Sequence, residues 1–180
     1  MAILDLVLFP DARLKTKCNE ITTFDDNIKT EILNMLESME HYKGIGLAAC
    51  QVGIMKQIFV MNHDVNSIKG EYFETKIDNL GYYFINPVIL ESSFEISEYE
   101  EGCLSFPDQR VIIERPETIS IRFQDIKGGF HEIKATKLAA ICIQHEMDHL
   151  NGIVMPDRVK SIFKRNNIIT KAKKIKSEIK

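Results

Sequence analysis

The sequence lacks three features that would each define a class of protein: a long apolar run, a secretory signal and a strong net charge. No stretch approaches the roughly 18 apolar residues of a membrane-spanning helix, and the N-terminus has neither the basic region nor the long apolar region of a signal peptide. We therefore expect a cytoplasmic protein that does not enter membranes. The formal net charge of −3 gives no general reason to expect a nucleic-acid partner, so we expect no DNA binding.

Cysteine is also scarce, with four residues in the chain: Cys18, Cys50, Cys103 and Cys142. Four thiols could form two disulfides, but a cytoplasmic chain of this size buries enough apolar surface to fold without them. Each cysteine is therefore expected either to fill the core or to bind a metal.

The 180 residues are 44% hydrophobic and 27% charged, which is typical of one globular domain spanning residues 1–180. Charge is unevenly distributed, because residues 158–180 contain nine Lys and Arg side chains against the single acid Glu178. This segment predicts a basic C-terminal helix. Two interpretations of it stay open: a solvated helix face, or a surface for an anionic partner such as RNA.

Two patterns of apolar spacing predict further helices. In residues 25–43, apolar side chains recur at i, i+4, i+7, i+8 and i+11, with aspartates near the start and Gly44 just past the end. A second helix is expected to begin at Lys137, capped by Thr136, and to end before Gly152. Its expected inner stripe consists of Leu138, Cys142, His145 and His149.

Between these helices, short segments rich in β-branched or aromatic residues and separated by Asn, Gly and Pro predict strands. They are residues 57–62, 82–85, 88–90, 95–99, 111–113, 118–124 and 130–135. The last two are joined by a turn and predict a hairpin. The polar residues 62–81 are too many for a hairpin loop and predict a surface excursion. The expected fold class is α+β, with antiparallel strands around a central helix, the one beginning at Lys137, and the C-terminal helix outside.

The most informative motif, His145-Glu146-Met147-Asp148-His149, lies on that central helix. Positions i and i+4 share a helix face, so both imidazoles can bind one cation while the Glu146 carboxylate lies near a water molecule on it. The pattern indicates a metal-dependent hydrolase, in which a metal lowers the pKa of its water and a carboxylate accepts the proton.

A hydrolytic metal normally has three protein ligands, so the motif needs a third. No histidine follows His149, and the only later carboxylates are Asp157 and Glu178, which leaves a peptidase of the common HExxH kind without a good donor. Upstream, Cys103 could complete a Cys-His-His site that suits Zn²⁺ or Fe²⁺. Taken alone, however, Cys103 also fits a buried structural cysteine.

Three segments together resemble the signature motifs of the peptide deformylase family, in the family's order. They are residues 44–51 (GIGLAACQ), 101–105 (EGCLS) and 144–152 (QHEMDHLNG). The similarity extends over nearly the whole chain and includes the basic C-terminal helix typical of the bacterial type. The resemblance implies a metal-dependent hydrolase that removes the N-terminal formyl group from formyl-methionine of newly synthesised polypeptides.

The resemblance also implies roles for individual residues. One divalent metal ion would be bound by Cys103, His145 and His149; Fe²⁺ is expected in the cell, and Zn²⁺, Ni²⁺ or Co²⁺ can replace it. A metal-bound water would be the nucleophile and Glu146 the general base and acid. The Gln51 side-chain amide and the Leu104 backbone N–H would stabilise the oxyanion. The pocket for the substrate methionine would involve Ile45, Gly46, Glu101, Gly102, Arg110, Leu138, Ile141, Cys142 and His145.

Some positions depart from the family's pattern or stay ambiguous. Cys50 stands where the family more often has a small or β-branched residue, and residues 62–81 are longer than expected, either shaping access to the cleft or forming a tolerated insertion. Gly46 and Gly102 are expected to let the backbone approach a peptide that pairs with it as an added strand. Arg110 and Arg115 are both ion-pair candidates, for structure or for substrate.

Two other functions are weighed against deformylation. The first is cleavage of internal peptide bonds, which the missing downstream ligand disfavours. The second is a catalytically silent binding protein that docks on ribosomal RNA through its basic tail, which the retention of Glu146 and Gln51 disfavours. In either case the basic helix makes the ribosome a candidate partner, besides the nascent polypeptides themselves.

Overall fold

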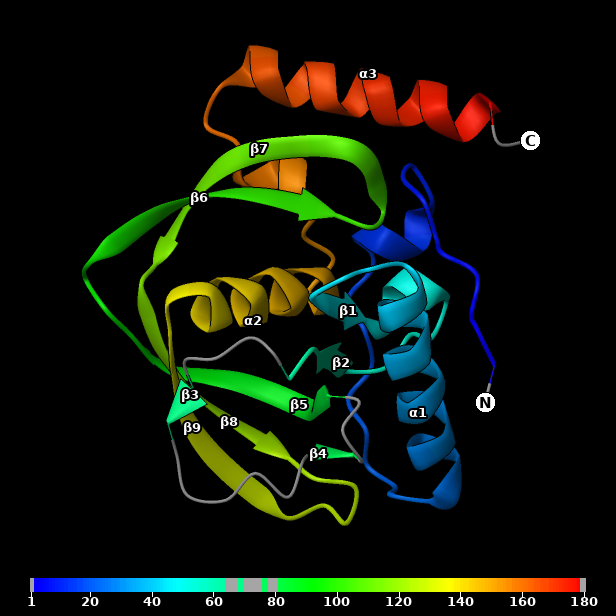
Figure 1. The fold of residues 1–180 in the computed structure, drawn as a ribbon, viewed down its shortest axis with the longest axis vertical. Coiled ribbons are helices and arrows are strands. Elements are labelled where there is room, and N and C mark those ends of the chain that lie inside the picture. Colours follow the sequence, from blue (N-terminus) through cyan, green and yellow to red (C-terminus); the bar gives the residue numbers. More distant parts are fainter. Residues whose placement is uncertain (1, 64–67, 70–75, 78–80, 179–180) are drawn as a thin grey trace.

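The computed structural model describes residues 2–63, 68–69, 76–77 and 81–178 (Figure 1). The helices are α1 (Asp26–His41), α2 (Lys137–Leu150) and α3 (Ile162–Glu178), with the short 3-10 helices η1 (Ala12–Lys15), η2 (Ala49–Val52) and η3 (Met155–Arg158). The strands are β1 (Gly46–Ala48), β2 (Ile58–Met61), β3 (Ile68–Lys69), β4 (Lys76–Ile77), β5 (Gly81–Ser92), β6 (Ile96–Cys103), β7 (Phe106–Pro116), β8 (Thr118–Gln124) and β9 (Phe130–Thr136). The predicted α+β class is confirmed.

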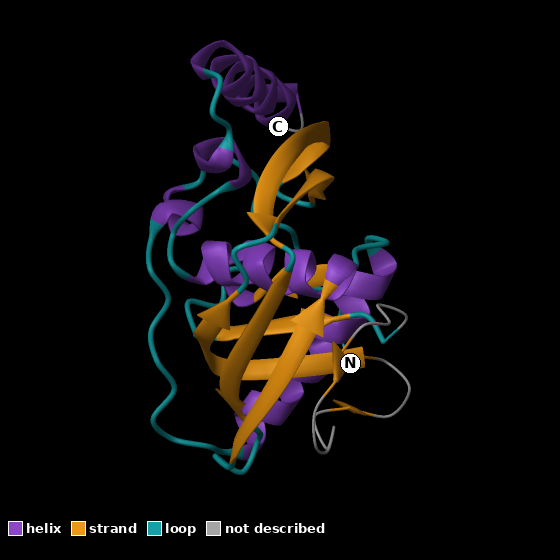
Figure 2. Cartoon of the chain, turned by 90° about the vertical axis from the view of Figure 1, so that its left-hand side faces the viewer, coloured by secondary structure: helices purple, strands orange, loops and turns teal. Residues whose placement is uncertain are grey.

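The strands form two separate antiparallel units. Among the described residues, the larger unit has seven strands in the order β1-β2-β5-β8-β9-β3, with β4 also paired to β5. The smaller unit is the β6–β7 hairpin, which lies apart from the main sheet (Figures 1 and 2). Strand β1 is the end strand of the main sheet, and β6 pairs only with β7, so both have an edge without a partner among the described strands.

Helix α2 is the central helix, and it lies between the main sheet and the β6–β7 hairpin (Figure 1). Each residue from Ala139 to Leu150 is buried, so the predicted single inner stripe was too narrow. A helix covered on two sides cannot keep one polar face. The helix begins at Lys137 as expected, with Thr136 at the N-cap position, but the Thr136 side chain makes no capping hydrogen bond.

Helix α1 covers the end of the main sheet beside β1 and β2. It begins as predicted, because the Asp25 carboxylate accepts from the backbone N–H groups of Asn27 and Ile28 at 3.1 and 3.2 Å. Its buried face, which includes Ile32 and Leu36, packs against apolar side chains of β1, β2 and β5. This packing fixes β1, and β1 leads directly into the segment that carries Gln51.

The two predicted strands on either side of Pro87 are one strand, β5. The ladder with β8 is interrupted between Ile85 and Val88, and Asn86 adopts a left-handed conformation with φ 47°. A bulge accommodates a proline, which has no N–H to give to a ladder. The side-chain amide of Asn86 donates to the Ile21 carbonyl at 2.7 Å, so the bulge is held in place.

The β6–β7 hairpin is much longer than the predicted strands over residues 95–99 and 111–113. Its register runs from Ile96↔Pro116 to Cys103↔Phe106, with a shift after Gly102. The motif of residues 101–105 therefore lies at the closed end of a hairpin, which holds its side chains more rigidly than a loop does.

The predicted excursion over residues 62–81 lies partly outside the described residues, which omit 64–67, 70–75 and 78–80. Of its described parts, Ile68 pairs with Ala135 of β9, and β4 pairs with the start of β5. None of its described residues lines the cleft described below.

The basic C-terminal helix is α3, and it packs outside β7 (Figure 1). It begins at Ile162, four residues later than the segment predicted from charge. Its buried side chains, Ile168 and Ala172, join an apolar cluster with Phe106 and Ile113 of β7. Among the described residues, no helix combines the length and apolarity needed to cross a bilayer.

Candidate metal centre and cleft

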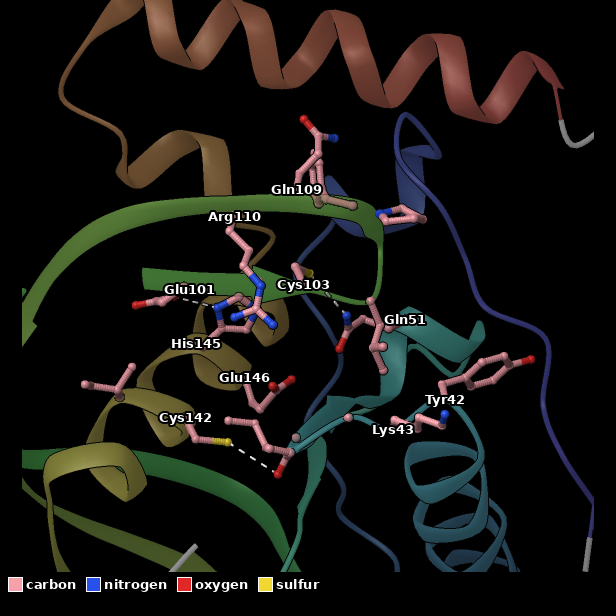
Figure 3. Close-up of a pocket in the computed structure, with 18 of the residues that line it drawn as sticks. Tyr42, Lys43, Gln51, Glu101, Cys103, Gln109, Arg110, Cys142, His145 and Glu146 are labelled. Carbon is pink, nitrogen blue, oxygen red and sulfur yellow. Dashed lines mark hydrogen bonds and ion pairs between the residues drawn. The ribbon is translucent and has the colours of Figure 1, made fainter. Parts of the chain in front are cut away.

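A cleft of about 590 Å³ lies between β1, the β6–β7 hairpin and α2 (Figure 3). It brings together segments as far apart in the sequence as Leu6 and Glu146. The predicted site residues that line it are Ile45, Gly46, Gln51, Glu101, Gly102, Cys103, Leu104, Arg110, Leu138, Ile141, Cys142, His145 and Glu146. The remaining predicted site residue, His149, is 1% exposed and lies behind Cys103.

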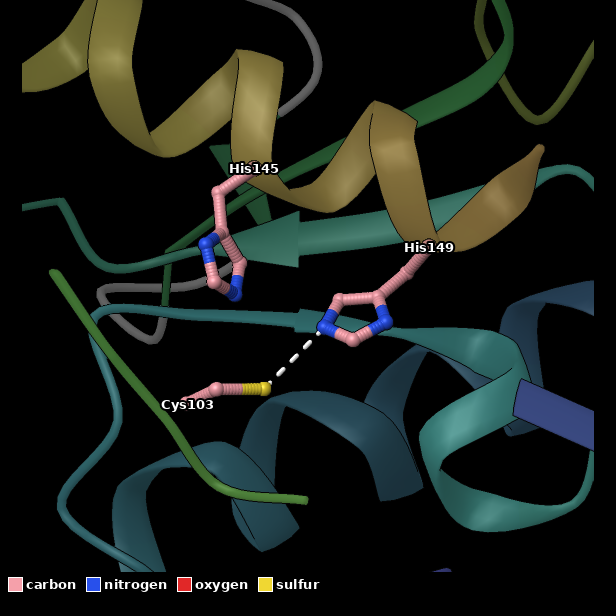
Figure 4. A group of neighbouring side chains, drawn as sticks. All are labelled: Cys103, His145 and His149. Carbon is pink, nitrogen blue, oxygen red and sulfur yellow. Dashed lines mark hydrogen bonds between the residues drawn. The ribbon is translucent and has the colours of Figure 1, made fainter. Parts of the chain in front are cut away.

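Cys103, His145 and His149 converge on one point (Figure 4). Their ligand atoms all lie within 4.8 Å of one another, and Cys103 Sγ lies 3.1 Å from His149 Nε2. A tetrahedral cation with bonds of about 2.3 Å to sulfur and 2.0 Å to nitrogen separates its ligand atoms by roughly 3.5 Å. The donor set therefore has the chemistry and the spacing for a divalent cation.

The His145 ring is oriented by Glu101. Nδ1 of His145 lies 2.8 Å from Glu101 Oε2, which leaves Nε2 as the nitrogen available to a cation. Arg115 in turn donates to both Glu101 oxygens, at 2.5 and 3.0 Å. A carboxylate on the distal nitrogen fixes the tautomer and orientation of a histidine ligand. Glu101 thus lines the cleft, but its carboxylate is engaged by Arg115 and His145 rather than directed at a substrate.

The electrostatics of the cluster favour a positive charge at the same point. Burial opposes protonation of His145, but its hydrogen bonds to Cys103 and Glu101 outweigh burial and raise its pKa well above the usual value. Burial, with the nearby charge of His145, lowers the pKa of His149 well below the usual value. His149 is therefore held neutral, which is the form of an imidazole that binds a metal.

Glu146 lies on the cleft side of α2, one residue from the histidine ligand position. Burial raises its pKa to about 7, against the opposing influence of His145. Its Oε2 atom is buried without a hydrogen-bond partner among the described residues. A carboxyl group with a pKa near neutrality and an unengaged oxygen in a cleft can both accept and donate a proton.

Position 46 needs a glycine because Glu146 packs against it, and not only because a peptide approaches it. A Cβ atom at Gly46 would lie 2.5 Å from Glu146 Oε1 and 2.7 Å from Cys142 Sγ, distances that real Cβ atoms essentially never show. At Gly102, by contrast, a Cβ atom would meet nothing closer than 3.7 Å. Strand β1 thus packs against the carboxylate itself.

The orientation of the Gln51 amide follows from its backbone partner. The Ala48 N–H can only donate, and it lies 2.8 Å from Gln51 Oε1, so the NH₂ group must face the other way. That group lies 3.5 Å from Cys103 Sγ (Figure 3) and 3.2 Å from Ser105 Oγ. Gln51 therefore directs a donor at the point where the three candidate metal ligands converge.

Two further cysteines and two arginines near the site differ in their burial and position. Cys142 lies in the cleft wall with its Sγ 3.6 Å from the Ile45 carbonyl, and burial raises its pKa well above the usual value. Cys50 is buried in the core behind Gln51. Arg115 is buried in ion pairs, whereas Arg110 is exposed in the cleft.

Several residues that line the cleft had no role there predicted from the sequence. They are Leu6, Tyr42, Lys43, Tyr99, Glu100, Phe106, Pro107, Asp108 and Gln109. Ser105, the hydrogen-bond partner of Gln51, was also missed, although its place in the motif of residues 101–105 could have indicated it. Six of these residues, from Tyr99 to Gln109, line the cleft because the hairpin folds over α2, whereas Leu6, Tyr42 and Lys43 come from segments outside the hairpin. No local pattern predicts either placement.

Residues 3–165 match the family model described as polypeptide deformylase. A peptide deformylase of Wolbachia sp. subsp. Drosophila simulans (strain wRi) is 41% identical over 99% of this chain and 98% of that protein. One of Rickettsia akari (strain Hartford) is 40% identical over 99% of each chain. The crystal structure of peptide deformylase from Ehrlichia chaffeensis superposes with a TM-score of 0.84 at 38% identity, covering 98% of both chains.

The donor set makes a prediction about metal content. Cys103→Ser should sharply lower the metal bound per chain, because a serine hydroxyl is a much poorer ligand than a thiolate for these ions. Metal is measured by atomic emission on protein purified without chelator. Cys142→Ser, which changes a neighbouring thiol outside the donor set, is the matched control. Equal metal content in wild type and Cys103→Ser would remove Cys103 from the site.

Proposed function

The chain belongs to the polypeptide deformylase family, and we propose that it removes the N-terminal formyl group from formyl-methionine of newly synthesised polypeptides. The observation that carries the proposal is the convergence of the Cys103, His145 and His149 donors with the Glu146 carboxyl group and the Gln51 amide on one cleft. We propose further that residues 1–180 act as one catalytic domain in the cytoplasm.

One divalent cation, held by Cys103, His145 and His149, belongs to this proposal. The sulfur and two imidazole nitrogens suit Fe²⁺, Zn²⁺, Ni²⁺ and Co²⁺ alike, so Fe²⁺ as the ion in the cell rests on the family resemblance. A cation bound there would act as a Lewis acid that lowers the pKa of a water molecule in the cleft.

Glu146 moves the protons of the reaction. Its carboxylate accepts the proton of the attacking water and then delivers it to the amine that leaves when the formyl C–N bond breaks. The pKa of about 7 suits both steps, since neither form of the carboxyl group is strongly favoured at neutral pH. The buried Oε2 atom, which has no hydrogen-bond partner within the described part of the chain, is the oxygen that would do this.

Gln51 and Leu104 stabilise the negative charge that develops on the formyl oxygen. The Gln51 NH₂ group is already directed at the site by the Ala48 N–H on its other end, so it needs no reorientation during the reaction. Leu104 lies in the tight turn between β6 and β7, and its backbone N–H donates to no backbone carbonyl among the described residues.

The polypeptide substrate lies in the cleft as an added strand between β1 and β6. Both have an edge without a partner among the described strands, and each lines one wall of the cleft. The methionine side chain is received by Ile45, Gly46, Gly102, Arg110, Leu138, Ile141 and Cys142, with Glu101 acting through His145. Formyl removal is favoured over internal cleavage, because the only described carboxylate soon after the motif, Asp157, is occupied by Lys15 and Arg165.

The activity is tested by formate release from formyl-Met-Ala-Ser by protein prepared anaerobically with Fe²⁺, or with Ni²⁺ or Co²⁺. Glu146→Gln should lower kcat/KM by about a hundredfold or more while metal content stays unchanged, since it removes only the proton acceptor. A wild-type protein that releases no formate with any of the three ions would refute the proposal.

The close packing at Gly46 gives a second test. Gly46→Ala should lower kcat at least about tenfold, because its methyl group must displace the Glu146 carboxylate that transfers the protons. Gly102→Ala has room in the free protein, so its effect should fall on KM through the substrate instead. The thermal unfolding midpoint of each variant is recorded alongside. A Gly46→Ala protein with wild-type kcat would show that the carboxylate does not act from this position.

We propose that α3 docks on ribosomal RNA and so brings the cleft to nascent chains. Lys164, Lys171 and Lys174 of this helix are exposed. Among the described residues, its only buried side chains are Ile168 and Ala172. A basic surface on an otherwise acidic chain is suited to an anionic partner.

Changing Lys164, Lys171 and Lys174 together to Gln should weaken binding to ribosomes. The slope of the logarithm of the binding constant against the logarithm of the salt concentration should become shallower by roughly two to three. Point changes are preferable to deletion, which would uncover the apolar cluster beneath α3. The control changes Lys17, Lys29 and Lys134, which are exposed elsewhere, to Gln. Equal weakening in both triple variants would leave α3 without a specific role. Binding is measured by co-sedimentation at several salt concentrations.

A further inference from the structure

A network of buried charges extends from His145 and Glu101, which line the cleft, to Arg115, Asp148 and Arg158, which line a second cavity. It begins with the Glu101 carboxylate, which lies 2.8 Å from His145 Nδ1. Arg115, 4% exposed, holds Glu101 with Nε and Nη2 and reaches Asp148 Oδ2 with Nη1 at 2.8 Å. One guanidinium thus joins two carboxylates, one of which orients the histidine.

Arg158 completes this network from a separate segment. It is the last residue of η3, and its Nε donates to Asp148 Oδ2 at 2.9 Å while its Nη2 donates to Asp148 Oδ1. The Asp148 side chain is 11% exposed and the Arg158 side chain 44% exposed, so Arg158 is the member nearest to solvent. With Arg158 in place, two guanidinium groups balance two carboxylates.

Without Arg158, Arg115 would be the only cationic partner of Asp148 among the described residues, while it also holds Glu101. The Asp148 carboxylate would then lose two of its three charged hydrogen bonds in a mostly buried position, which is strongly unfavourable. Arg115 would be drawn toward Asp148, and its two hydrogen bonds to Glu101 would lengthen. Because Glu101 fixes the His145 ring through Nδ1, the ring would lose its restraint.

We propose that Arg158 is a positioning residue for the metal centre: acting through Asp148, Arg115 and Glu101, it holds the His145 ring in the orientation that binds the cation. The inference rests on the proposed function insofar as His145 is a ligand of that cation. The neighbouring residue Asp157 pairs with Arg165 of α3 and with Lys15 of η1, so the same turn also anchors the C-terminal helix.

A second cavity, of about 230 Å³, makes the proposal testable by chemical rescue. It is lined by Arg115, Asp148 and Arg158, among others, and lies behind α2. Truncation of Arg158 to alanine would enlarge it beside the Asp148 carboxylate. Methylguanidinium from solution could then occupy the place of the missing side chain.

The experiment uses the full chain loaded with Ni²⁺ and measures the rate of metal loss to excess EDTA. Arg158→Ala should lose the ion about three- to tenfold faster than wild type, less than is typical when a direct partner of a ligand is removed. Millimolar methylguanidinium should slow the loss again, saturably, in Arg158→Ala and not in wild type. Lys160→Ala, which removes the exposed ion pair to Glu114 two residues away, should behave as wild type.

Metal loss at the wild-type rate in Arg158→Ala would overturn the proposal. So would faster loss that methylguanidinium does not slow, since a general loosening of the fold is not repaired by filling one cavity. These outcomes are distinct from failure of the proposed function, in which the wild-type protein itself retains no Ni²⁺ or releases no formate.

Discussion

The arrangement of this protein depends on the burial of a polar helix. The second half of α2 carries two histidines, a glutamate and an aspartate, and all of them are buried. Such groups are stable in an interior only when polar partners are at hand, and the side chains that the main sheet packs against α2 are apolar. The β6–β7 hairpin lies on the opposite side of α2, where Cys103, Glu101 and Arg115 are partners of His149, His145 and Asp148.

The same requirement explains why the cleft lies where it does. Since the hairpin is separate from the main sheet, β6 and β1 are two strand edges on either side of α2, with the cation ligands between them. Gly46 lets β1 come within contact distance of Glu146, and η2 then turns the chain so that the Gln51 amide reaches the Cys103 sulfur. The site thus lies where the main sheet and the β6–β7 hairpin meet at α2, against which both pack.

Helical periodicity was sufficient to predict α2 and the common face of His145 and His149, because both depend only on local spacing. The strand segments were recognisable, but β5 was divided at Pro87, since the sequence does not reveal that a bulge absorbs the proline. Cys103 fitted either a metal ligand or a buried structural cysteine until the resemblance favoured the ligand. The Arg115 network could not be predicted, because it depends on the register of the hairpin and on its packing over α2.

The ligand positions also bear on how the chain folds. Cys103 and His149 are 46 residues apart in the sequence; Cys103 ends β6, and His149 lies on α2. A cation held by both would act as a cross-link closing that loop, and the chain-entropy argument used for disulfides gives about 4 kcal/mol for a loop of this length. Docking of the hairpin on α2 and binding of the ion would therefore reinforce each other. The ion would then stabilise the folded chain as well as take part in the reaction.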